Sequence, residues 1–183
     1  MLNRFFDILL SSFGLVFLSP LLVIIYTFAF FDTGAPLFRQ QRVGRYRLPF
    51  SLLKFRSMHK KTASVASHLV NPTAITQLGH FLRRSKLDEL PQLWNVLKGE
   101  MSLVGPRPCL TTQHDLISAR EKFGVFAVRP GITGLAQISG IDMSNPELLA
   151  QTDARMIAEM STSNYLKYIF LTIVGKGSGN GAK

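Results

Sequence analysis

The sequence predicts an α+β protein that is associated with a membrane through its N-terminal segment. Three observations lead to this fold class: an uncharged apolar run over residues 8–31, an alternation of apolar and basic residues over 36–58 that is typical of strands, and helical spacing of apolar residues in several later segments. We expect a membrane segment over residues 1–32, a compact and mainly helical domain with a short β element over residues 33–175, and a flexible tail over residues 176–183. A chain of 183 residues has room for one such domain with a real core and little room for a second.

The positive charge of the chain is concentrated in one segment. Residues 33–107 hold thirteen lysines and arginines and three acidic residues, a net charge of +10 that equals the charge of the whole chain. Such a segment is expected to meet phosphate, whether on a nucleotide, a lipid or a nucleic acid. The single cysteine, Cys109, excludes a disulfide within the chain, and the four histidines lack the spacing of metal ligands.

The apolar run from Ile8 to Phe31 contains 24 residues without a charge. As a straight helix it would be about 36 Å long, which is enough to cross a hydrocarbon core of about 30 Å. A secretory signal peptide fits poorly, because the run is too long, Arg4 is the single basic residue before it, and no cleavage site of small residues follows. A buried core helix is the less favoured alternative for so long an N-terminal run.

Ser19 and Pro20 interrupt this run at its middle. Proline removes a helical hydrogen bond and clashes with the preceding turn, so the helix is bent or broken here. The Ser19 hydroxyl and an adjacent protein element are the two candidate partners for a freed carbonyl. Two geometries remain open from the residues: a kinked span, or a helix-break-helix that enters and leaves by the same face. The basic cluster after the run places residues 33 onward on the cytoplasmic side. The charged residues near both ends slightly favour the re-entrant form: Arg4, Asp7 and Asp32.

Residues 36–58 predict a strand, a turn at Gly44 and a second strand. Lys54 and Arg56 flank Phe55, so they share one face of the second strand. This basic pair either faces anionic lipid or a phosphorylated ligand, or forms a solvated strand face. Residues 60–75 show no periodicity and predict a mobile loop.

Two short helices are predicted after this loop. The first covers residues 76–84, with an inward face made of Leu78, Phe81 and Leu82. The second begins near Pro91 and stops at Gly99. Its inward face is expected to consist of Leu90, Leu93, Trp94 and Leu97.

Asp88 and Glu89 lie at the start of the second of these helices, inside the most basic part of the chain. N-capping would stabilise the helix by about 1 kcal/mol, but a cap needs only one acid. The neighbouring bases Arg83, Arg84 and Lys86 should lower the pKa values of the two carboxyl groups. The pair is therefore a candidate nucleophile or metal ligand that is ionised at neutral pH, and the same helix terminus also suits a phosphate.

Two arginines lie in loops rich in proline and glycine: Arg107 in "GPRP", residues 105–108, and Arg129 in "RPGITG", residues 129–134. Proline fixes backbone angles and glycine allows close approach, so such loops can hold a guanidinium against a phosphate. Each loop alone is more simply explained as a structural turn. Together with the basic strands and the acid pair, they indicate phosphoryl chemistry at a membrane surface. The chain has no P-loop and no dinucleotide fingerprint, which argues against an ordinary kinase donor.

In these motifs the sequence resembles the bacterial sugar transferases, the monotopic phosphoglycosyl transferases that move a phosphosugar from a UDP-sugar to polyprenyl phosphate. The resemblance covers nearly the whole chain, and its longest motifs are "LGHFLRRSKLDELPQLWNVLKGEMSLVGPRP" and "VRPGITGLAQISG". It implies a minimal form with one catalytic domain, a re-entrant membrane helix broken at Ser19 and Pro20, and a place on the cytoplasmic face of the bacterial inner membrane. The implied products are UMP and a polyprenyl-diphosphate sugar, in the first membrane step of assembling an O-antigen, a capsule or the glycan of a glycoprotein.

The site residues of this family map onto the sequence by position. Its Asp-Glu pair falls on Asp88 and Glu89, which implies Asp88 as the nucleophile that forms a covalent phosphosugar-aspartyl intermediate, and both residues as the holders of Mg²⁺. The residues implied to bind phosphate and nucleotide are Lys54, Arg56, Arg83, Arg107, Pro108 and Arg129. The implied partners are a UDP-sugar, polyprenyl phosphate and membrane lipid, with no nucleic acid, and a homo-oligomer is left open.

The sequence departs from the family pattern at a few places. Lys86 stands where Ser or Thr is usual, and the usual acid and arginine before "IT" are replaced within "NPTAIT", residues 71–76. Two other interpretations compete with the transferase. A non-catalytic basic module that binds the membrane surface would explain the charge but not the acid pair, and an aspartyl-phosphate hydrolase would share the nucleophile but transfer the group to water.

Overall fold

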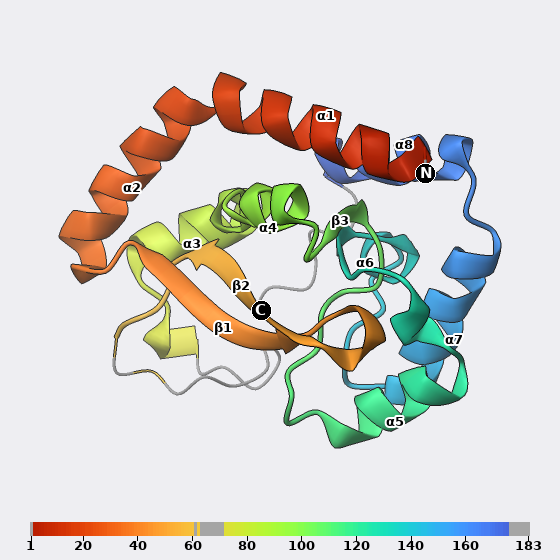
Figure 1. Cartoon of the computed structure of the whole chain (residues 1–183). Helices are drawn as coiled ribbons and strands as arrows, with labels where there is room; N and C mark the ends of the chain where they lie inside the picture. The colour runs from red at the N-terminus through yellow and green to blue at the C-terminus, as the bar shows by residue number, and fades with distance from the viewer. Residues whose placement is uncertain (1, 61, 63–71, 176–183) are drawn as a thin grey trace.

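The computed structural model describes residues 2–60, 62 and 72–175 (Figure 1). It has the predicted α+β composition. Its helices and strands, in chain order, are α1 (Leu2–Phe17), α2 (Ser19–Thr33), β1 (Leu37–Val43), β2 (Pro49–Phe55), α3 (Gln77–Arg84), α4 (Gln92–Lys98), β3 (Ser102–Val104), α5 (His114–Lys122), β4 (Gly131–Thr133), α6 (Leu135–Ile138), α7 (Pro146–Ala158) and α8 (Thr162–Ile173). Short 3₁₀ turns cover Arg45–Arg47, Pro72–Ala74, Leu87–Glu89 and Val125–Ala127. The expected tail over 176–183 and most of the expected loop over 60–75 lie outside the described residues.

Helices α1 and α2 meet at a bend of 64° and form an arc along one side of the molecule (Figure 1). Pro20 has no N–H to donate to the Val16 carbonyl four residues before it, and the Ser19 hydroxyl donates to that carbonyl instead (2.8 Å). Of the two candidate partners for the freed carbonyl, the Ser19 hydroxyl is thereby confirmed. In the described part of the chain, a single helix that is long and apolar enough to cross a membrane is not found, whereas the bent pair meets the requirement jointly by length and composition.

The first turns of α1 are fixed to the rest of the protein by polar contacts. Asp7 is only 2% exposed. Its Oδ1 accepts three hydrogen bonds, from the Ser102 hydroxyl (2.9 Å), the Leu103 amide (2.8 Å) and the Tyr165 hydroxyl (2.7 Å). Arg4 donates to two of the last carbonyls of α4 (2.6 and 2.9 Å). The N-terminal end of α1 is therefore bound to β3, α4 and α8.

Both N-terminal helices also expose large apolar side chains. On α1 these are Phe5, Ile8, Leu9, Phe13, Val16 and Phe17, and on α2 they are Val23, Ile24, Tyr26, Phe28, Phe30 and Phe31. The residues of α2 that are fully buried against the domain are Ile25 and Ala29. An apolar surface of this extent is typical of a segment that contacts lipid or another protein.

The hairpin of β1 and β2 forms as predicted. The strands are antiparallel, in register from Leu37 opposite Phe55 to Val43 opposite Pro49. The turn begins at Gly44, whose amide donates to the Leu48 carbonyl (2.9 Å). Phe55 packs with Ile25 of α2 and Leu82 of α3, so this hairpin connects the N-terminal helices to the region of the acid pair.

Two of the inward positions predicted for α3 and α4 are wrong, since Phe81 is 60% exposed and Trp94 is 52% exposed. On α4 the polar Asn95 is buried instead. Its side-chain oxygen accepts from the Leu53 amide (3.0 Å) and its amide nitrogen donates to the Ser51 carbonyl (2.8 Å), which ties α4 to β2. Adjacent residues on a helix differ by about 100° in direction, so the burial of Asn95 turns Trp94 outward.

Strands β3 and β4 form a two-stranded parallel sheet that the sequence pattern did not predict. This pairing places the two loops rich in proline and glycine side by side. The Gly105 amide donates to the Thr133 carbonyl (2.8 Å), and the Gly131 amide donates to the Pro106 carbonyl (2.9 Å). A Cβ atom on Gly131 would overlap the backbone of Gly105, so this close approach requires glycine.

Candidate active site

Asp88 and Glu89 lie in the 3₁₀ turn Leu87–Glu89, just before α4. The preceding residue, Lys86, adopts a left-handed conformation (φ 58°), which reverses the chain after α3. The sequence predicted the acid pair at the start of the helix itself. The structure places the pair one short turn earlier, because Pro91 separates it from the first residue of α4, Gln92.

The side chain of Glu89 is held by two cations from different parts of the chain. Its Oε1 accepts from Lys54 Nζ on β2 (2.8 Å) and from Arg107 Nη2 in the loop after β3 (3.0 Å). Burial by itself would raise the pKa of Glu89, but the charges and hydrogen bonds of Lys54 and Arg107 outweigh it and lower the pKa to about 2. Glu89 is therefore ionised at neutral pH, as the sequence predicted.

The side chain of Asp88 is in a different situation. It is 8% exposed, and it forms no hydrogen bond or ion pair with any described residue. Burial raises the pKa of Asp88 above its ordinary value, although Lys54 and Arg83 act in the opposite direction. The expected lowering of the pKa is therefore wrong for Asp88, because the effect of burial outweighs that of the neighbouring cations. No partner in the described chain has to be displaced before the Asp88 carboxylate can react.

Arg83, at the end of α3, is also brought to the acid pair. Its Nε donates to the Ser57 hydroxyl (2.9 Å), which orients the guanidinium. Burial lowers the pKa of Arg83, and the charge of Asp88 counteracts this effect, so the two groups lie close enough to interact. Arg83 is thus a half-buried cation beside the buried carboxylate.

Arg107 reaches the acid pair from a loop that is otherwise buried. Its neighbours Pro106 and Pro108 are buried, whereas the Arg107 side chain remains 37% exposed. Pro108 contributes its backbone carbonyl to the structure of the loop, where it accepts from Arg42 (3.1 Å). Lys54, Arg83 and Arg107 therefore converge on Asp88 and Glu89 from three separate segments.

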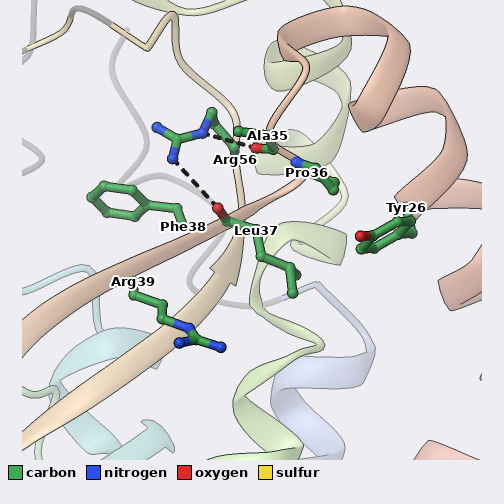
Figure 2. Close-up of a pocket in the computed structure, with 7 residues that line it drawn as sticks. All are labelled: Tyr26, Ala35, Pro36, Leu37, Phe38, Arg39 and Arg56. Carbon is green, nitrogen blue, oxygen red and sulfur yellow. Dashed lines mark hydrogen bonds between the residues drawn. The ribbon is translucent and has the colours of Figure 1, made fainter.

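Arg56 is directed elsewhere (Figure 2). It follows the last residue of β2, and its guanidinium donates to the carbonyls of Ala35 (2.9 Å) and Leu37 (3.4 Å). It also lies 5.3 Å from the centre of the Phe38 ring. These residues line a groove of about 470 Å³ at the junction of α2 and β1, together with Tyr26, Pro36 and Arg39. In this structure Arg56 stabilises that junction, and its guanidinium forms no hydrogen bond or ion pair with Asp88 or Glu89.

Arg129 is also separate from the acid pair. Its Nε donates to the Gly99 carbonyl at the C-terminal end of α4 (2.7 Å). Arg4 binds the last carbonyls of the same helix. Asp88 and Glu89 precede the N-terminal end of α4, so Arg129 and the pair lie at opposite ends of this helix.

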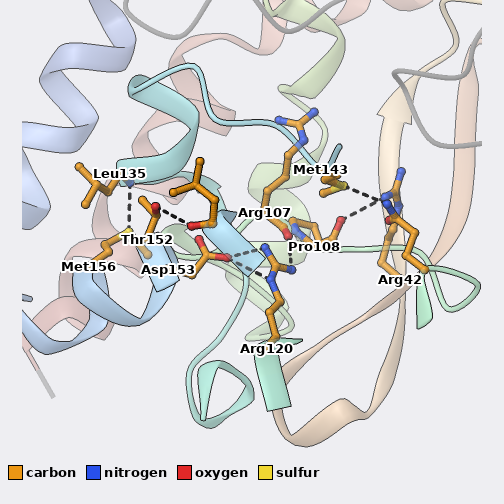
Figure 3. A network of polar contacts seen from close by, with 11 residues as sticks. Arg42, Arg107, Pro108, Arg120, Leu135, Met143, Thr152, Asp153 and Met156 are labelled. Carbon is orange, nitrogen blue, oxygen red and sulfur yellow. Dashed lines mark hydrogen bonds and ion pairs between the residues drawn. The ribbon is translucent and has the colours of Figure 1, made fainter. Parts of the chain in front are cut away.

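Three buried charged residues near Arg107 were not among the candidate site residues that the sequence predicted (Figure 3). They are Arg42, Arg120 and Asp153. The sequence pattern could have indicated two of them. Asp153 lies on the buried apolar stripe of α7, between Leu149 and Met156. Arg120 lies one helical turn after the buried Leu116. A charged residue on an apolar stripe indicates a buried and paired charge.

The acid pair has a donor set that suits Mg²⁺. Within the described residues, no group of three or more histidine, cysteine or acidic side chains is placed to hold a metal ion. Magnesium, however, is usually bound through one or two carboxylates and completes its coordination with water and substrate phosphate. Asp88 and the second oxygen of Glu89 are available for this, because Lys54 and Arg107 both bind Oε1.

Comparison with known proteins identifies the family of the chain. A family model described as bacterial sugar transferase matches residues 1–176. The chain belongs to the bacterial sugar transferase family. The resemblance implied by the sequence motifs is thereby confirmed.

Several curated members of this family are similar to the chain. The UDP-galactose-lipid carrier transferase of Erwinia amylovora is 36% identical over 189 residues, which cover 94% of this chain and 39% of that protein. The UDP-glucose:undecaprenyl-phosphate glucose-1-phosphate transferase of Caulobacter vibrioides is 37% identical, with 93% and 68% covered. The exopolysaccharide production protein ExoY of Rhizobium meliloti is 35% identical, with 94% and 84% covered. The chain thus spans about two fifths of the Erwinia relative and most of the Rhizobium relative.

Proposed function

We propose that this protein transfers a sugar phosphate from a UDP-sugar to polyprenyl phosphate and releases UMP. The observation that carries the proposal is the contrast within the acid pair: Asp88 is buried without a bonding partner in the described chain, while Glu89 beside it is held by Lys54 and Arg107. The names of two relatives support the substrate class. One refers to UDP-galactose and a lipid carrier, and the other to UDP-glucose and undecaprenyl phosphate.

In the first half-reaction, the Asp88 carboxylate attacks the phosphorus that carries the sugar. A bond forms between a carboxylate oxygen and this phosphorus, the bond from the phosphorus to the oxygen of the uridine phosphate breaks, and UMP leaves with the electron pair. Arg83 and Arg107 bind the diphosphate oxygens. Ser57 orients the first of these guanidinium groups and Glu89 the second, so both are preorganised for the substrate.

In the second half-reaction, an oxygen of polyprenyl phosphate attacks the phosphorus of the phosphosugar-aspartyl intermediate. Asp88 leaves as a free carboxylate, and the product is a polyprenyl-diphosphate sugar. Asp88 and Glu89 would hold Mg²⁺, which when bound supplies charge neutralisation for the diphosphate. This two-step route implies ping-pong kinetics, with parallel lines when one substrate is varied at fixed levels of the other.

We also propose that α1 and α2 enter the membrane as a re-entrant hairpin, and that the rest of the protein lies on the cytoplasmic face. Asp7 near the start of α1 is bonded to Ser102 and Tyr165, and β1 follows directly after α2. Both ends of the pair are therefore bound to the same domain. This supports entry and exit by one face of the membrane, with Ser19 and Pro20 at the deepest point.

Incubation of the purified protein with a pool of UDP-sugars and polyprenyl phosphate tests the activity. We expect UMP and a polyprenyl-diphosphate sugar with the wild type, and neither with Asp88→Asn. A binding module would release no UMP from any UDP-sugar. A hydrolase would release UMP and free sugar phosphate at the same rate with and without polyprenyl phosphate.

Labelling of Asn3→Cys tests the membrane arrangement separately. The native Cys109 is buried, so it should give little background. A reagent that cannot cross the inner membrane should leave residue 3 unlabelled in intact cells and label it after the membrane is opened. Labelling in intact cells would refute the re-entrant arrangement without affecting the proposed chemistry.

A further inference from the structure

Two buried arginines away from the acid pair hold the backbone of the loop that carries Arg107 (Figure 3). Arg120 on α5 donates Nη1 to the Arg107 carbonyl (2.8 Å), and Arg42 on β1 donates Nη1 to the Pro108 carbonyl (3.1 Å). Figure 3 shows the two guanidinium groups reaching the loop from different sides, while the Arg107 side chain extends away from both. Arg42 is 9% exposed and Arg120 is 2% exposed.

The composition of this loop limits how its backbone can be held. Residues 106 and 108 are prolines and have no N–H group to donate. The loop is bonded to β4 at its start, through Gly105 and Pro106, and to β1 at its end, where the Val43 amide donates to the Cys109 carbonyl (3.0 Å). Between these points, among the described residues, the carbonyls of Arg107 and Pro108 are bonded by the two guanidinium groups alone. The direction of the Arg107 side chain therefore depends on Arg42 and Arg120.

Arg120 is neutralised by an acid on another helix. Its Nε and Nη2 both donate to Asp153 Oδ2 on α7 (3.0 and 2.7 Å), and Asp153 is fully buried. This ion pair fixes the guanidinium, whose Nη1 remains free to bind the Arg107 carbonyl. The loop is thereby attached to both α5 and α7.

Arg42 differs because it is buried without an acidic partner among the described residues. Nη2 donates to the side-chain oxygen of Gln40, and Nε has no hydrogen-bond partner. Burial lowers the pKa of Arg42 to about 10, and the nearby charge of Arg107 contributes to this, whereas the charge of Glu89 acts in the opposite direction. A buried cation that is not bonded to a counterion is unfavourable for stability. The hairpin does not require it, since the backbone of β1 is already paired with β2.

We propose that Arg42 and Arg120 are positioning residues for Arg107. They fix the carbonyls of the loop so that the Arg107 guanidinium meets both Glu89 and the diphosphate of the nucleotide sugar. Neither residue contacts the acid pair directly in this structure. The proposal rests on the proposed function, because the role of Arg107 is to bind the UDP-sugar.

Three variants and one control test the proposal. Arg42→Met removes the donor to Pro108 together with the unpaired charge. The double variant Arg120→Met/Asp153→Leu removes the donor to Arg107 while leaving no buried charge unpaired, which protects the fold. Arg42→Lys keeps the positive charge but presents a single compact donor in place of the planar group. The control is Arg47→Met, an exposed arginine that pairs with Glu121 at the surface (2.8 Å).

We expect kcat/KM for the UDP-sugar to fall at least tenfold in Arg42→Met, in Arg42→Lys and in the double variant. The kcat/KM for polyprenyl phosphate should change less than threefold, and the melting temperature of Arg42→Met should stay within a few degrees of the wild type. Arg47→Met should match the wild type in every respect. Wild-type kinetics in Arg42→Met or in Arg42→Lys would overturn the proposal. An equal fall for both substrates that follows the folded fraction would also overturn it, because a merely structural role predicts that result.

Hydrogen exchange of the amides of Arg107 and Cys109, measured without substrate, tests the loop independently of the reaction. Both amides should exchange faster in Arg42→Met and in the double variant, with no change in Arg47→Met. Unchanged exchange in both variants would refute the positioning role. If the wild type releases no UMP but exchange responds as expected, the proposed function has failed and the positioning of the loop stands.

Discussion

Asp7 and Asp88 are both buried aspartates, at 2% and 8% exposure, yet their surroundings are opposite. Asp7 Oδ1 accepts hydrogen bonds from three neutral donors of β3 and α8, and Asp7 Oδ2 lies 3.9 Å from the Arg4 guanidinium. Asp88 accepts none from the described residues, although Lys54, Arg83 and Arg107 lie around it. The hydrogen bonds of the Asp7 carboxylate are therefore made within the protein. The Asp88 carboxylate remains available to a substrate or a metal ion.

This difference teaches that burial alone does not identify a reactive carboxylate. A buried acid that is bonded by fixed neutral donors contributes to stability, because breaking those bonds leaves polar groups without partners. A buried acid that is surrounded by cations but bonded to none of them is energetically unfavourable in the free protein, and such sites are typical of catalysis. The two aspartates should therefore respond to substitution in opposite ways.

The largest effect is expected for Asp88→Asn. The amide has the shape of the carboxylate but is a poor nucleophile, so kcat should fall by several orders of magnitude. The melting temperature should not decrease, since no hydrogen bond to a described residue is lost. Steady-state UMP release and thermal unfolding in detergent measure the two quantities, and mass spectrometry of the wild type should find one added phosphosugar on the peptide that contains Asp88. A label on another peptide would contradict the assignment of the nucleophile.

Asp7→Ala should give the reverse result. It leaves the donors at Ser102, Leu103 and Tyr165 without their acceptor, which should destabilise the protein by about 3–5 kcal/mol. For a chain of this size the melting temperature should fall by roughly 10 °C. The kcat per folded molecule, determined below the transition, should equal that of the wild type. A specific loss of kcat at full stability would remove the distinction between the two aspartates.

Arg107→Lys should have an intermediate effect that is limited to one substrate. Lysine cannot reproduce the planar contact that we propose between Arg107 and the diphosphate. Losing such a charged hydrogen bond costs about 2 kcal/mol, or roughly thirtyfold in kcat/KM for the UDP-sugar. The KM for polyprenyl phosphate should change far less. Initial rates with each substrate varied in turn measure these two effects. Normal UDP-sugar kinetics would mean that the loop of residues 105–108 has only a structural role.

The smallest effect is expected for Tyr165→Phe, which removes one of the three donors to Asp7. The loss of a single hydrogen bond to a charged group should cost about 1.5 kcal/mol of stability. Activity per folded molecule should not change. Chemical denaturation of the variant beside Asp7→Ala would show whether the three donors act independently, in which case the single change accounts for roughly a third of the total.

Local signals in the sequence were sufficient for several parts of the fold and the site. Pro20 predicted the bend, Gly44 the hairpin turn and Gly99 the end of α4, because each acts on its own stretch of backbone. The acid pair was selected as a candidate site from a local signal as well, since two adjacent acids are unusual in a strongly basic segment. The family of the chain followed from the same motifs.

The parts that failed depend on contacts between distant segments. Trp94 was predicted inward from its apolar character, but the bonds from Asn95 to β2 decide which face of α4 is buried. The parallel pairing of β3 and β4 joins segments almost thirty residues apart, and three-residue strands leave almost no pattern. The raised pKa of Asp88 could not be foreseen either, because it depends on how deeply the folded chain buries this side chain.

The attachment of α1 through Arg4 and Asp7 has a practical consequence for making a version of this protein that stays in solution without detergent. Deleting residues 1–32 would remove an acceptor from the centre of the fold and a cap from α4, and would expose the surface that these residues cover. A better design keeps both helices and recodes their outer face. Polar replacements at Phe13, Val16, Phe17, Phe28 and Phe31, all more than half exposed, would leave every contact of Arg4 and Asp7 in place. The N-terminal segment would then serve as an ordinary part of a water-soluble protein.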